Sequence, residues 1–211
     1  MNLKINKFNI QTEPFRYALA DFDVPFSYEE LLDAIDIEPD SYKLRTNNTN
    51  FQKMEIRTSH TKGIIDDLLI LMSSHELTKS LSAVFDIAPL TSDISYDGGG
   101  LTITDVGGHL HYHADFPYSN KVKKYRVINC LLYLSSPNIK GGDLHLLDPS
   151  TRTVEASVQP LWGRVIAFPT TRHTPHGFSK VKEGRRISVN AYFYADHPLD
   201  ERYSPSKTEW L

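Results

Sequence analysis

From Gly98 onward, apolar and β-branched residues come in short runs that alternate with polar positions, a pattern typical of β-strands. Turn-forming residues separate these runs, and Gly141-Gly142 and Asp148-Pro149-Ser150 are the clearest turn sequences. The pattern predicts strands near residues 101–106, 109–114, 125–134, 143–148, 153–158, 164–168, 174–178 and 186–194. Short strands at hairpin spacing favour two facing sheets or a jelly roll, so the chain is predicted to be mainly β.

The first 95 residues have a mixed pattern in which helical spacing predominates. Ser27 and Glu30 have the spacing of a capping box, ahead of apolar positions at 31–35. Farther along, apolar residues recur three and four positions apart, which predicts an amphipathic helix over residues 61–72. This region is therefore expected to be mostly helical support for the strands that follow.

Two further stretches of the N-terminal region need separate interpretation. Ser73 and Glu76 are suited to cap a third helix, whose apolar positions continue through Phe85. The polar stretch from Asp40 to Asn50 lacks periodicity. It is either a loop beside a functional site or a surface connection, and the surface connection is the simpler interpretation.

The last predicted strand has two faces of different chemistry, because successive side chains of a strand point to opposite faces. One face is polar and consists of Arg186, Ser188, Asn190, Tyr192 and Tyr194, whereas the other consists of Ile187, Val189, Ala191 and Phe193. The apolar face is suited to pack against the helices, and the polar face to line an anion-binding pocket. A slip of one residue would exchange the faces and turn Arg185 inward in place of Arg186.

Three side chains on these strands could bind a metal ion. His113 and Asp115 are two positions apart, a spacing that puts both on one face of a strand. A second imidazole, that of His176, comes from a later predicted strand. Two imidazoles and one carboxylate on one face of an octahedron leave three positions open, as in non-haem Fe(II) oxygenases. Ten residues after His176 lies Arg186, whose planar guanidinium is suited to bind a carboxylate.

Other histidines compete for these roles. His173 is the alternative distal ligand, although it lacks the Gly-Phe sequence that follows His176. His109 and His111 share the parity of His113, and His145 lies on a predicted core strand. These three residues either line a pocket or have surface and structural roles, and the sequence leaves both interpretations open.

The sequence around these residues resembles the Fe(II)/2-oxoglutarate-dependent dioxygenases, and is most similar to their prolyl 4-hydroxylase-like branch. The matching blocks are residues 110–117, 126–135, 141–144, 160–168 and 176–194. The resemblance implies a double-stranded β-helix, a cupin-like jelly roll, with N-terminal helices buttressing one sheet. The length is that of a single domain, expected to comprise a helical support region at 1–95, a catalytic core at 96–197 and a C-terminal tail at 198–211.

The same resemblance implies the cofactors and the residues that hold them. Fe(II) would be bound by His113, Asp115 and His176. The cosubstrates would be 2-oxoglutarate and O2, and ascorbate is a candidate stimulant. Arg186 and Tyr133 would bind the distal carboxylate of 2-oxoglutarate, and the polar candidates to complete this pocket are Asn129 and Ser188.

Two positions depart from the family pattern. Ser135 replaces the usual asparagine after the Tyr-Leu pair, and Thr104 stands where many relatives have a tyrosine. One contact to the cosubstrate or to the substrate is therefore either missing or supplied from elsewhere.

The activity that the resemblance implies is hydroxylation of an amino-acid or peptidyl, proline-like substrate, with succinate and CO2 as coproducts. Halogenation is not expected, because related halogenases have glycine or alanine at the position of Asp115. The alternatives are a hydroxylase of another small metabolite and a cupin-like metal-binding or sensor module without turnover. The pair of Arg186 and Tyr133 favours the oxygenase, since a simple metal-binding module needs no anion pocket.

The composition bears on the cellular compartment of the protein. The single cysteine among 211 residues, Cys130, cannot form an internal disulfide, which favours a reducing, cytoplasmic setting. No signal peptide is visible after Met1, and no apolar run approaches the length needed to span a membrane. The formal net charge of −3 indicates little about partners, and the oligomeric state stays open.

Two basic clusters are the remaining charge feature. One is formed by Lys121, Lys123, Lys124 and Arg126, and the other by Lys180, Lys182, Arg185 and Arg186. Solvated faces are the simpler interpretation, and attraction of an acidic substrate is the functional one. Nucleic acid is not an expected partner, because the nucleic-acid dealkylating dioxygenases have a second arginine where this chain has Tyr192. The expected substrate is a small molecule or a peptide.

Overall fold

The computed structural model describes residues 5–36, 43–45, 50–56, 63–200 and 208–211. The helices are α1 (Tyr28–Asp36), α2 (Ile64–Met72) and α3 (His75–Phe85). The strands are β1 (Asn9–Gln11), β2 (Tyr17–Asp21), β3 (Lys43–Arg45), β4 (Asn50–Ile56), β5 (Thr91–Ser92), β6 (Gly100–Ala114), β7 (Tyr118–Ser119), β8 (Lys124–Tyr133), β9 (Lys140–Gly141), β10 (Leu144–Leu147), β11 (Val154–Val158), β12 (Arg164–Pro169), β13 (His176–Phe178), β14 (Val181–Glu183), β15 (Arg186–Ala195) and β16 (Glu209–Trp210).

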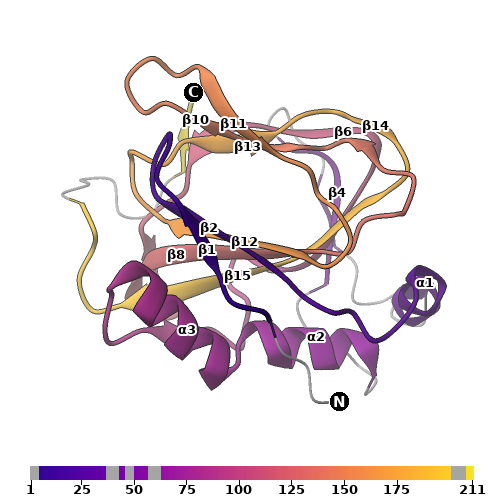
Figure 1. Cartoon of the computed structure of the whole chain (residues 1–211), viewed down its shortest axis with the longest axis horizontal. Coiled ribbons are helices and arrows are strands. Elements are labelled where there is room, and N and C mark those ends of the chain that lie inside the picture. The colour runs from indigo at the N-terminus through magenta and orange to yellow at the C-terminus, as the bar shows by residue number, and fades with distance from the viewer. Residues whose placement is uncertain (1–4, 37–42, 46–49, 57–62, 201–207) are drawn as a thin grey trace.

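One curled antiparallel sheet makes up most of the fold (Figure 1). Its main path runs in the order β1-β2-β12-β8-β15-β6-β13-β10-β11. The sheet curls so that β2, β12, β8 and β15 form one layer and β13, β10 and β11 lie in the layer that faces it (Figure 1). This arrangement confirms the predicted mainly-β fold, a double-stranded β-helix with helices on one side.

The layer of β2, β12, β8 and β15 is buried on both faces. Helices α2 and α3 cover its outer face (Figure 1), where Cys130 and Leu132 of β8 pack with the helical side chains. Leu131 and Tyr133 of the same strand pack instead between the two sheet layers. Burial on both sides explains why β8 is a continuous apolar run rather than an alternating one. The predicted apolar face of β15 lies in the helix-side core, as expected.

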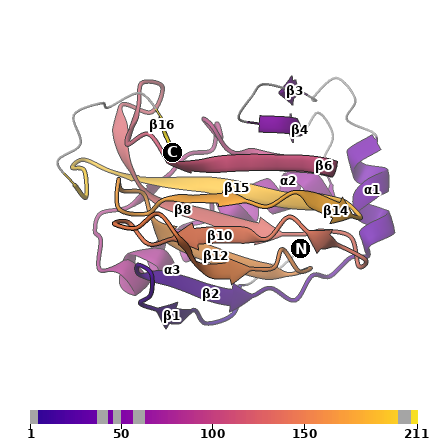
Figure 2. The same ribbon diagram turned by 90° about the horizontal axis from the view of Figure 1, so that it is seen from above.

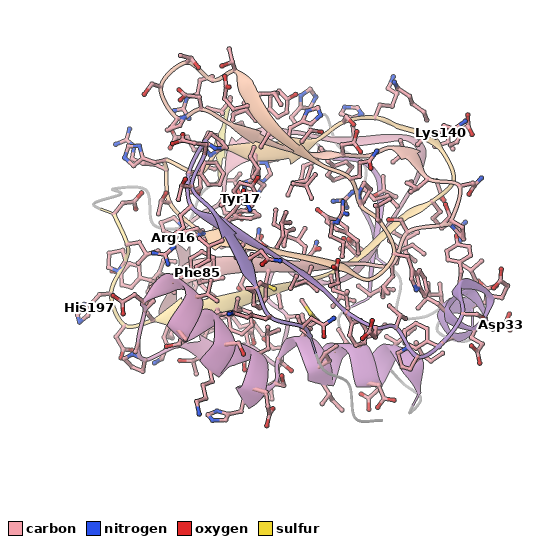
Figure 3. The ribbon with its side chains drawn as sticks, viewed as in Figure 1. Arg16, Tyr17, Asp33, Phe85, Lys140 and His197 are labelled. Atoms are coloured by element: carbon pink, nitrogen blue, oxygen red, sulfur yellow. The ribbon has the colours of Figure 1, made fainter. Side chains whose placement is uncertain are left out.

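The start of β2 links the helix layer to the core between the sheets (Figure 3). The guanidinium carbon of Arg16 lies 5.9 Å from the ring centre of Phe85, the last residue of α3. The next residue, Tyr17, packs between the sheet layers in the same cluster as Phe168. Arg16 thus contacts helix α3, and Tyr17 contacts the core between the sheet layers.

The strands predicted at 101–106 and 109–114 form one continuous strand, β6, so the prediction of two strands was wrong. Gly107 has a φ of 91°, and the pairing of β6 with β4 shifts register between Thr104 and His109. The two glycines at 107 and 108 let the strand bulge without ending, because a bulge adds a residue while the ladder continues on either side. One strand consequently carries both Thr104, opposite Arg186, and His113.

The capping box predicted at the start of α1 is present. The backbone N–H of Ser27 donates to the carboxylate of Glu30 at 2.7 Å. The backbone N–H of Glu30 in turn donates to Oγ of Ser27 at 3.1 Å. Helix α2 also lies where it was predicted, and residues 61 and 62 of that prediction lie outside the described residues.

The predicted cap of α3 was wrong by one residue. Ser74 is the N-cap, and its side chain accepts a hydrogen bond from the backbone N–H of Leu77 at 3.2 Å. Ser73 still donates its backbone N–H to the carbonyl of Leu69 and ends α2. Because only Ser74 has the extended backbone that an N-cap needs, it takes the role.

The N-terminal region supplies strands that its periodicity did not predict. β2 pairs with β12, and β4 pairs with β6, so residues before 95 extend the main sheet as well as support it. Within the predicted loop from Asp40 to Asn50, residues 43–45 form β3 and Asn50 begins β4. The rest of that prediction lies outside the described residues.

The C-terminal region also adds a strand to the sheet (Figure 2). In β16, Glu209 is opposite Ala114 and Trp210 is opposite His113 of β6. The region expected to be a tail thus includes residues that lie beside a predicted metal ligand.

Among the described residues, no helix is both long enough and apolar enough to cross a lipid bilayer.

The packing of α2 predicts how two of its residues contribute to stability. Leu68 is fully buried, whereas Ile70 of the same helix is 59% exposed. Leu68→Ala is expected to lower the free energy of unfolding by about 2–5 kcal/mol, because it leaves a cavity in the core. Ile70→Ala is the control and should change it by about 0.5 kcal/mol or less. Urea unfolding followed by circular dichroism measures both, and equal losses would contradict the assigned packing of α2.

Candidate active site

Three potential ligands converge where β6 meets β13. His113 lies near the end of β6, Asp115 follows that strand, and His176 begins β13. The two histidines are cross-strand partners, and their ring centres are 4.6 Å apart. Nε2 of His113 is 3.4 Å from Oδ1 of Asp115, and Nε2 of His176 is 3.7 Å from Oδ2. One ligand atom from each residue lies within 4.8 Å of the others, close enough to share one metal ion.

Hydrogen bonds to the backbone fix both imidazoles with Nε2 toward the carboxylate. Nδ1 of His113 donates to the carbonyl of His111 at 2.9 Å, and Nδ1 of His176 donates to the carbonyl of Thr174 at 3.0 Å. Because a carbonyl oxygen can only accept, each Nδ1 carries the proton and each Nε2 keeps a free lone pair. This is the tautomer that an Nε2-bound metal ion requires.

Burial and charge favour the protonation states that bind metal. Burial alone would raise the pKa of Asp115, but the proximity of His113, His176 and Arg126 lowers that pKa well below its usual value. Burial lowers the pKa of His176 to about 4, with a contribution from nearby His113. At neutral pH the site therefore presents a carboxylate and, from His176, a neutral imidazole, as metal binding needs.

Asp115 has further partners in the pocket. Nδ2 of Asn129 donates to its Oδ2 at 2.9 Å, which leaves the buried Oδ1 of Asn129 without a hydrogen-bond partner. The hydroxyl of Tyr192 also bonds to Asp115. The guanidinium carbon of Arg126 lies 4.1 Å from the centre of the Tyr192 ring. The structure therefore places Asn129 beside the metal-site carboxylate, in the same pocket that Arg186 lines.

The same pocket holds a buried cation, Arg186, which is 2% exposed. Its Nε donates to the carbonyl of Gly142 at 3.0 Å, Nη1 to Oγ of Ser188 at 3.3 Å, and Nη2 to the hydroxyl of Tyr133 at 3.4 Å. Its guanidinium carbon is 4.0 Å from the ring centre of Phe178. Among the described residues, no carboxylate lies within 4.0 Å of this guanidinium. A buried charge without a counter-ion is costly, so this end of the pocket is suited to bind an anion.

The register of β15 turns Arg186 inward and Arg185 outward. Nε of Arg185 donates to Asp105 at 2.7 Å near the surface, where the two side chains are 36% and 45% exposed. Farther along the inward face, Asn190 and Tyr192 line the pocket, as the parity of the strand predicts.

Tyr194 ends the predicted polar face of β15 but contacts Arg126 rather than the pocket. The register of β15 against β8 shifts at this point, where Phe193 is opposite Ile128 and Tyr194 is opposite Arg126. The hydroxyl of Tyr194 instead accepts a hydrogen bond from Nε of Arg126 at 3.3 Å. Tyr194 thus supports Arg126 and is not among the described residues that line the pocket.

Two glycines permit close approaches beside the functional side chains. A Cβ on Gly142, which has a φ of 71°, would lie 3.1 Å from Cδ of Arg186. A Cβ on Gly177 would lie 2.7 Å from the carbonyl oxygen of Leu110, between β13 and β6. Each position needs glycine to hold the neighbouring Arg186 or His176 where it lies.

Tyr133 and Ser188 lie behind Arg186 rather than on the open wall of the pocket. Tyr133 is fully buried, and burial raises the pKa of its phenol although Arg186 opposes that shift. Its hydroxyl accepts from Arg186, so its own proton stays available to a second acceptor. Oγ of Ser188 lies 2.9 Å from Oγ1 of Thr102 and also donates to Asn190 at 2.9 Å. Both residues thus hold Arg186 in place.

The competing histidines lie outside this pocket. His173 is exposed, which removes it as the alternative distal ligand. His109 and His111 pack edge to face with ring centres 5.1 Å apart, and His145 is 2.8 Å from the hydroxyl of Tyr112. These residues do not line the pocket of the predicted metal ligands within the described part of the chain.

Sequence reasoning missed three contributors to the site. Arg126 belongs to a basic cluster interpreted as a solvated face, yet it is 1% exposed and lines the pocket. Trp210 and Thr208 line the same pocket from the C-terminal region. The apolar run that begins right after Arg126 was a signal for its burial, whereas a two-residue strand gives no periodicity that could have identified Trp210.

The pocket has a volume of about 170 Å³. The described residues that line it include the three predicted metal ligands, both buried arginines and the side chains of Thr102, Thr104, Leu110, Phe116, Asn129, Leu131, Leu144, Phe178, Asn190, Tyr192, Thr208 and Trp210. The predicted metal ligands and the unpaired cation therefore open into one pocket.

Comparison with known proteins identifies this arrangement. Residues 99–194 match the family model described as the 2OG-Fe(II) oxygenase superfamily. Mouse (Mus musculus) prolyl 3-hydroxylase 3 is 43% identical over 65 residues, which are 31% of this chain and 9% of that protein. The chain thus spans about a tenth of the length of the curated relatives that it matches.

Solved structures share the fold. A prolyl-4-hydroxylase from Pseudomonas putida superposes with a TM-score of 0.60 at 15% identity, covering 86% of this chain and 93% of that one. A prolyl hydroxylase from Trichoplax adhaerens, solved with a peptide fragment of the hypoxia inducible factor oxygen degradation domain, has a TM-score of 0.53 at 16% identity. It covers 84% of this chain and 83% of that one.

The matched segment contains His113, Asp115, His176 and Arg186, the residues whose convergence the structure shows. Residues 99–194 therefore match the 2OG-Fe(II) oxygenase superfamily, whose members depend on Fe(II) and 2-oxoglutarate.

Proposed function

We propose that this chain hydroxylates a proline-like residue of a peptide, or the corresponding free amino acid, with 2-oxoglutarate and O2 as cosubstrates. One observation carries the proposal. A site of two imidazoles and one carboxylate shares a pocket with Arg186, a buried cation without an anionic partner among the described residues. The first feature suits iron, and the second suits the far carboxylate of 2-oxoglutarate.

Under this proposal, His113, Asp115 and His176 hold Fe(II). The donor set fits, because both Nε2 atoms carry free lone pairs and point at the carboxylate. When bound, the iron supplies the redox chemistry that activates O2. Asn129 and Tyr192 orient Asp115 by their hydrogen bonds, which keeps one face of the ligand set fixed.

Arg186 binds the distal carboxylate of 2-oxoglutarate in this proposal. Its fork can form two parallel charge-assisted hydrogen bonds, and the phenol of Tyr133 can donate a third. Ser188 and the carbonyl of Gly142 hold the guanidinium before the cosubstrate arrives. The ring of Phe178 covers one face of the guanidinium and keeps water away from it.

Arg126 is suited to orient the substrate. It lies beside Asp115, and its buried Nη1 has no hydrogen-bond partner. A substrate carbonyl oxygen in the pocket would supply the missing acceptor and hold the reacting carbon near the metal. In the overall reaction one oxygen atom of O2 enters the product hydroxyl, and the other enters succinate as CO2 leaves 2-oxoglutarate.

The proline-like substrate rests on the relatives. The curated relatives are named as prolyl 3-hydroxylases, and two solved neighbours are prolyl hydroxylases, one of them bound to a peptide. We also propose a reducing, cytoplasmic setting. Its support is that Cys130 is free and buried, and that burial raises the pKa of its thiol, which disfavours oxidation.

The experiment that tests the proposed function measures succinate release and substrate oxidation together. Purified protein is incubated with Fe(II), ascorbate and 2-oxoglutarate, and with a panel of proline-containing peptides and free amino acids. We expect succinate in each reaction and a gain of one oxygen atom, seen by mass spectrometry, in at least one substrate. Metal binding without any succinate would contradict the proposal and favour a metal-binding module.

The proposed metal ligands make one prediction. His113→Ala, Asp115→Ala and His176→Ala are each expected to abolish Fe(II)-dependent succinate release while leaving the circular dichroism spectrum unchanged. The reason is that each removes one of three ligands from a site that has no spare donor among the described residues. Asp115→Gly should also abolish hydroxylation.

His173→Ala is the control for the metal prediction. His173 is exposed and lies three residues before His176, so its loss should leave activity intact. Full activity in His176→Ala together with lost activity in His173→Ala would show that the distal ligand is misassigned.

The proposed anion site makes a second prediction. Loss of one partner from a buried charged pair costs about 2–5 kcal/mol. Arg186→Ala should therefore raise the apparent KM for 2-oxoglutarate by roughly 30-fold to several thousand-fold at saturating iron. Arg186→Lys keeps the charge but loses the fork, so its effect should be intermediate. Tyr133→Phe removes one hydrogen bond, worth about 0.5–1.5 kcal/mol, and should have a smaller effect.

Arg185→Ala is the matched control, because Arg185 is adjacent in sequence yet pairs with Asp105 at the surface. Its KM for 2-oxoglutarate should equal that of the wild type. A large effect at Arg185 with none at Arg186 would contradict the register of β15, and no effect at either would remove the 2-oxoglutarate assignment.

A further inference from the structure

Four aromatic rings form a continuous row through the proposed metal site. The ring of Trp210 is 4.9 Å from that of His113, centre to centre, and the ring of His113 is 4.6 Å from that of His176. The ring of Phe168 completes the row, 4.7 Å from His176. All three separations fall in the range in which aromatic pairs attract one another. The two imidazoles are therefore held between a tryptophan and a phenylalanine.

The register of the sheet produces this row. His113 has a cross-strand partner on each side, which are His176 in β13 and Trp210 in β16. Side chains directly opposite one another on neighbouring strands share a face and touch. The backbone N–H of Leu211 donates to the carbonyl of Tyr112 at 3.0 Å, which continues the β16 pairing past Trp210. Trp210 is thus placed by the backbone and not by its side chain alone.

The two ends of the row are anchored differently. Phe168 is fully buried in β12, within the core between the sheet layers. Trp210 is 42% exposed, and β16 pairs only with β6 among the described strands. Trp210 and Thr208 also line the pocket that contains His113 and Asp115. The inner face of the imidazole pair is therefore fixed by the core, and its outer face by a two-residue strand.

We propose that Trp210 is a positioning residue for His113, and that β16 closes the outer side of the metal pocket. This inference rests on the proposed function, in which His113 binds Fe(II). The hydrogen bond from Nδ1 to the carbonyl of His111 fixes the tautomer of His113, but it restrains only one edge of the ring. Rotation about the bond to the ring is otherwise broad, so the tilted rings of Trp210 and His176 on either side of His113 keep its Nε2 aimed at the metal.

The expected effect of losing Trp210 on metal binding follows from two typical magnitudes. An aromatic pair changes an equilibrium constant by about two- to tenfold. Loss of groups that orient metal ligands typically costs about 10–100-fold in metal affinity. The two ranges meet at roughly tenfold, which is the expected effect of Trp210→Ala on metal release.

The experiment uses the full chain loaded with Co(II), whose visible spectrum reports ligand geometry independently of turnover. Dissociation is followed after adding excess chelator, for the wild type, Trp210→Ala, Trp210→Phe and the control Leu211→Ala. Leu211 is adjacent, 48% exposed and absent from the pocket lining. We expect about tenfold faster release and an altered spectrum in Trp210→Ala, near wild-type behaviour in Trp210→Phe, and no change in Leu211→Ala.

Several outcomes would overturn the inference. Wild-type release and spectrum in Trp210→Ala would show that His113 needs no support from this ring. Equal acceleration in Trp210→Ala and Leu211→Ala would assign the effect to strand docking in general. If metal-free Trp210→Ala melts at a lower temperature than the wild type, the test passes to Trp210→Leu, which keeps apolar bulk without an aromatic ring. Co(II) release from Trp210→Leu that is as slow as from Trp210→Phe would then contradict a role for the aromatic ring.

Failure of this inference is distinguishable from failure of the proposed function. A wild-type protein that does not bind Co(II) through His113, Asp115 and His176 contradicts the proposed metal site itself. A wild-type protein that binds Co(II) and is unaffected by Trp210→Ala contradicts only the role of Trp210.

Discussion

The pairing of His113 with His176 across β6 and β13 is the contact on which the site depends. β13 has only three residues, yet it is paired on both sides, with Leu146 of β10 as the other partner of His176. A slip of one residue in the pairing of β13 with β6 or with β10 would turn the imidazole of His176 to the opposite face of the sheet. The close approach at Gly177 is specific to the present register, because a side chain there would strike the backbone of β6. Strand β15 belongs to the layer that is buried against α2 and α3 and also pairs with β6, so it fixes β6 to that layer.

Burial of Arg186 imposes the second constraint. A guanidinium that is 2% exposed needs compensation before any anion arrives. The fold supplies it from neutral groups, namely the carbonyl of Gly142, two hydroxyls and the ring of Phe178. Neutral partners leave the positive charge available, whereas a protein carboxylate would consume it. The structure thus tolerates an unpaired cation at a place where a carboxylate ligand would stabilise it.

Much of this site could be predicted from sequence, because its residues follow from strand periodicity. The spacing of His113 and Asp115 and the parity that turns Arg186 inward depend only on alternation, which β-strands obey over long runs. Elements that depend on tertiary pairing could not be predicted in this way. The short strand β16 and the continuity of β6 through Gly107 are set by neighbouring strands, not by local propensity. Arg126 was misjudged because its charge suggested solvent, whereas two aromatic rings bury it.

The charges around the pocket are consistent with one cosubstrate in particular. Arg126 and Arg186 contribute two positive charges, and Asp115 contributes one negative charge. Asp97, whose carboxylate is 3.6 Å from Arg126, offsets the charge of that arginine. Asp143 also acts on Arg186, yet among the described residues no carboxylate is in contact with its guanidinium. An anionic cosubstrate such as 2-oxoglutarate is therefore favoured at Arg186, whereas the space beside Arg126 favours a substrate group without net charge, such as a peptide carbonyl.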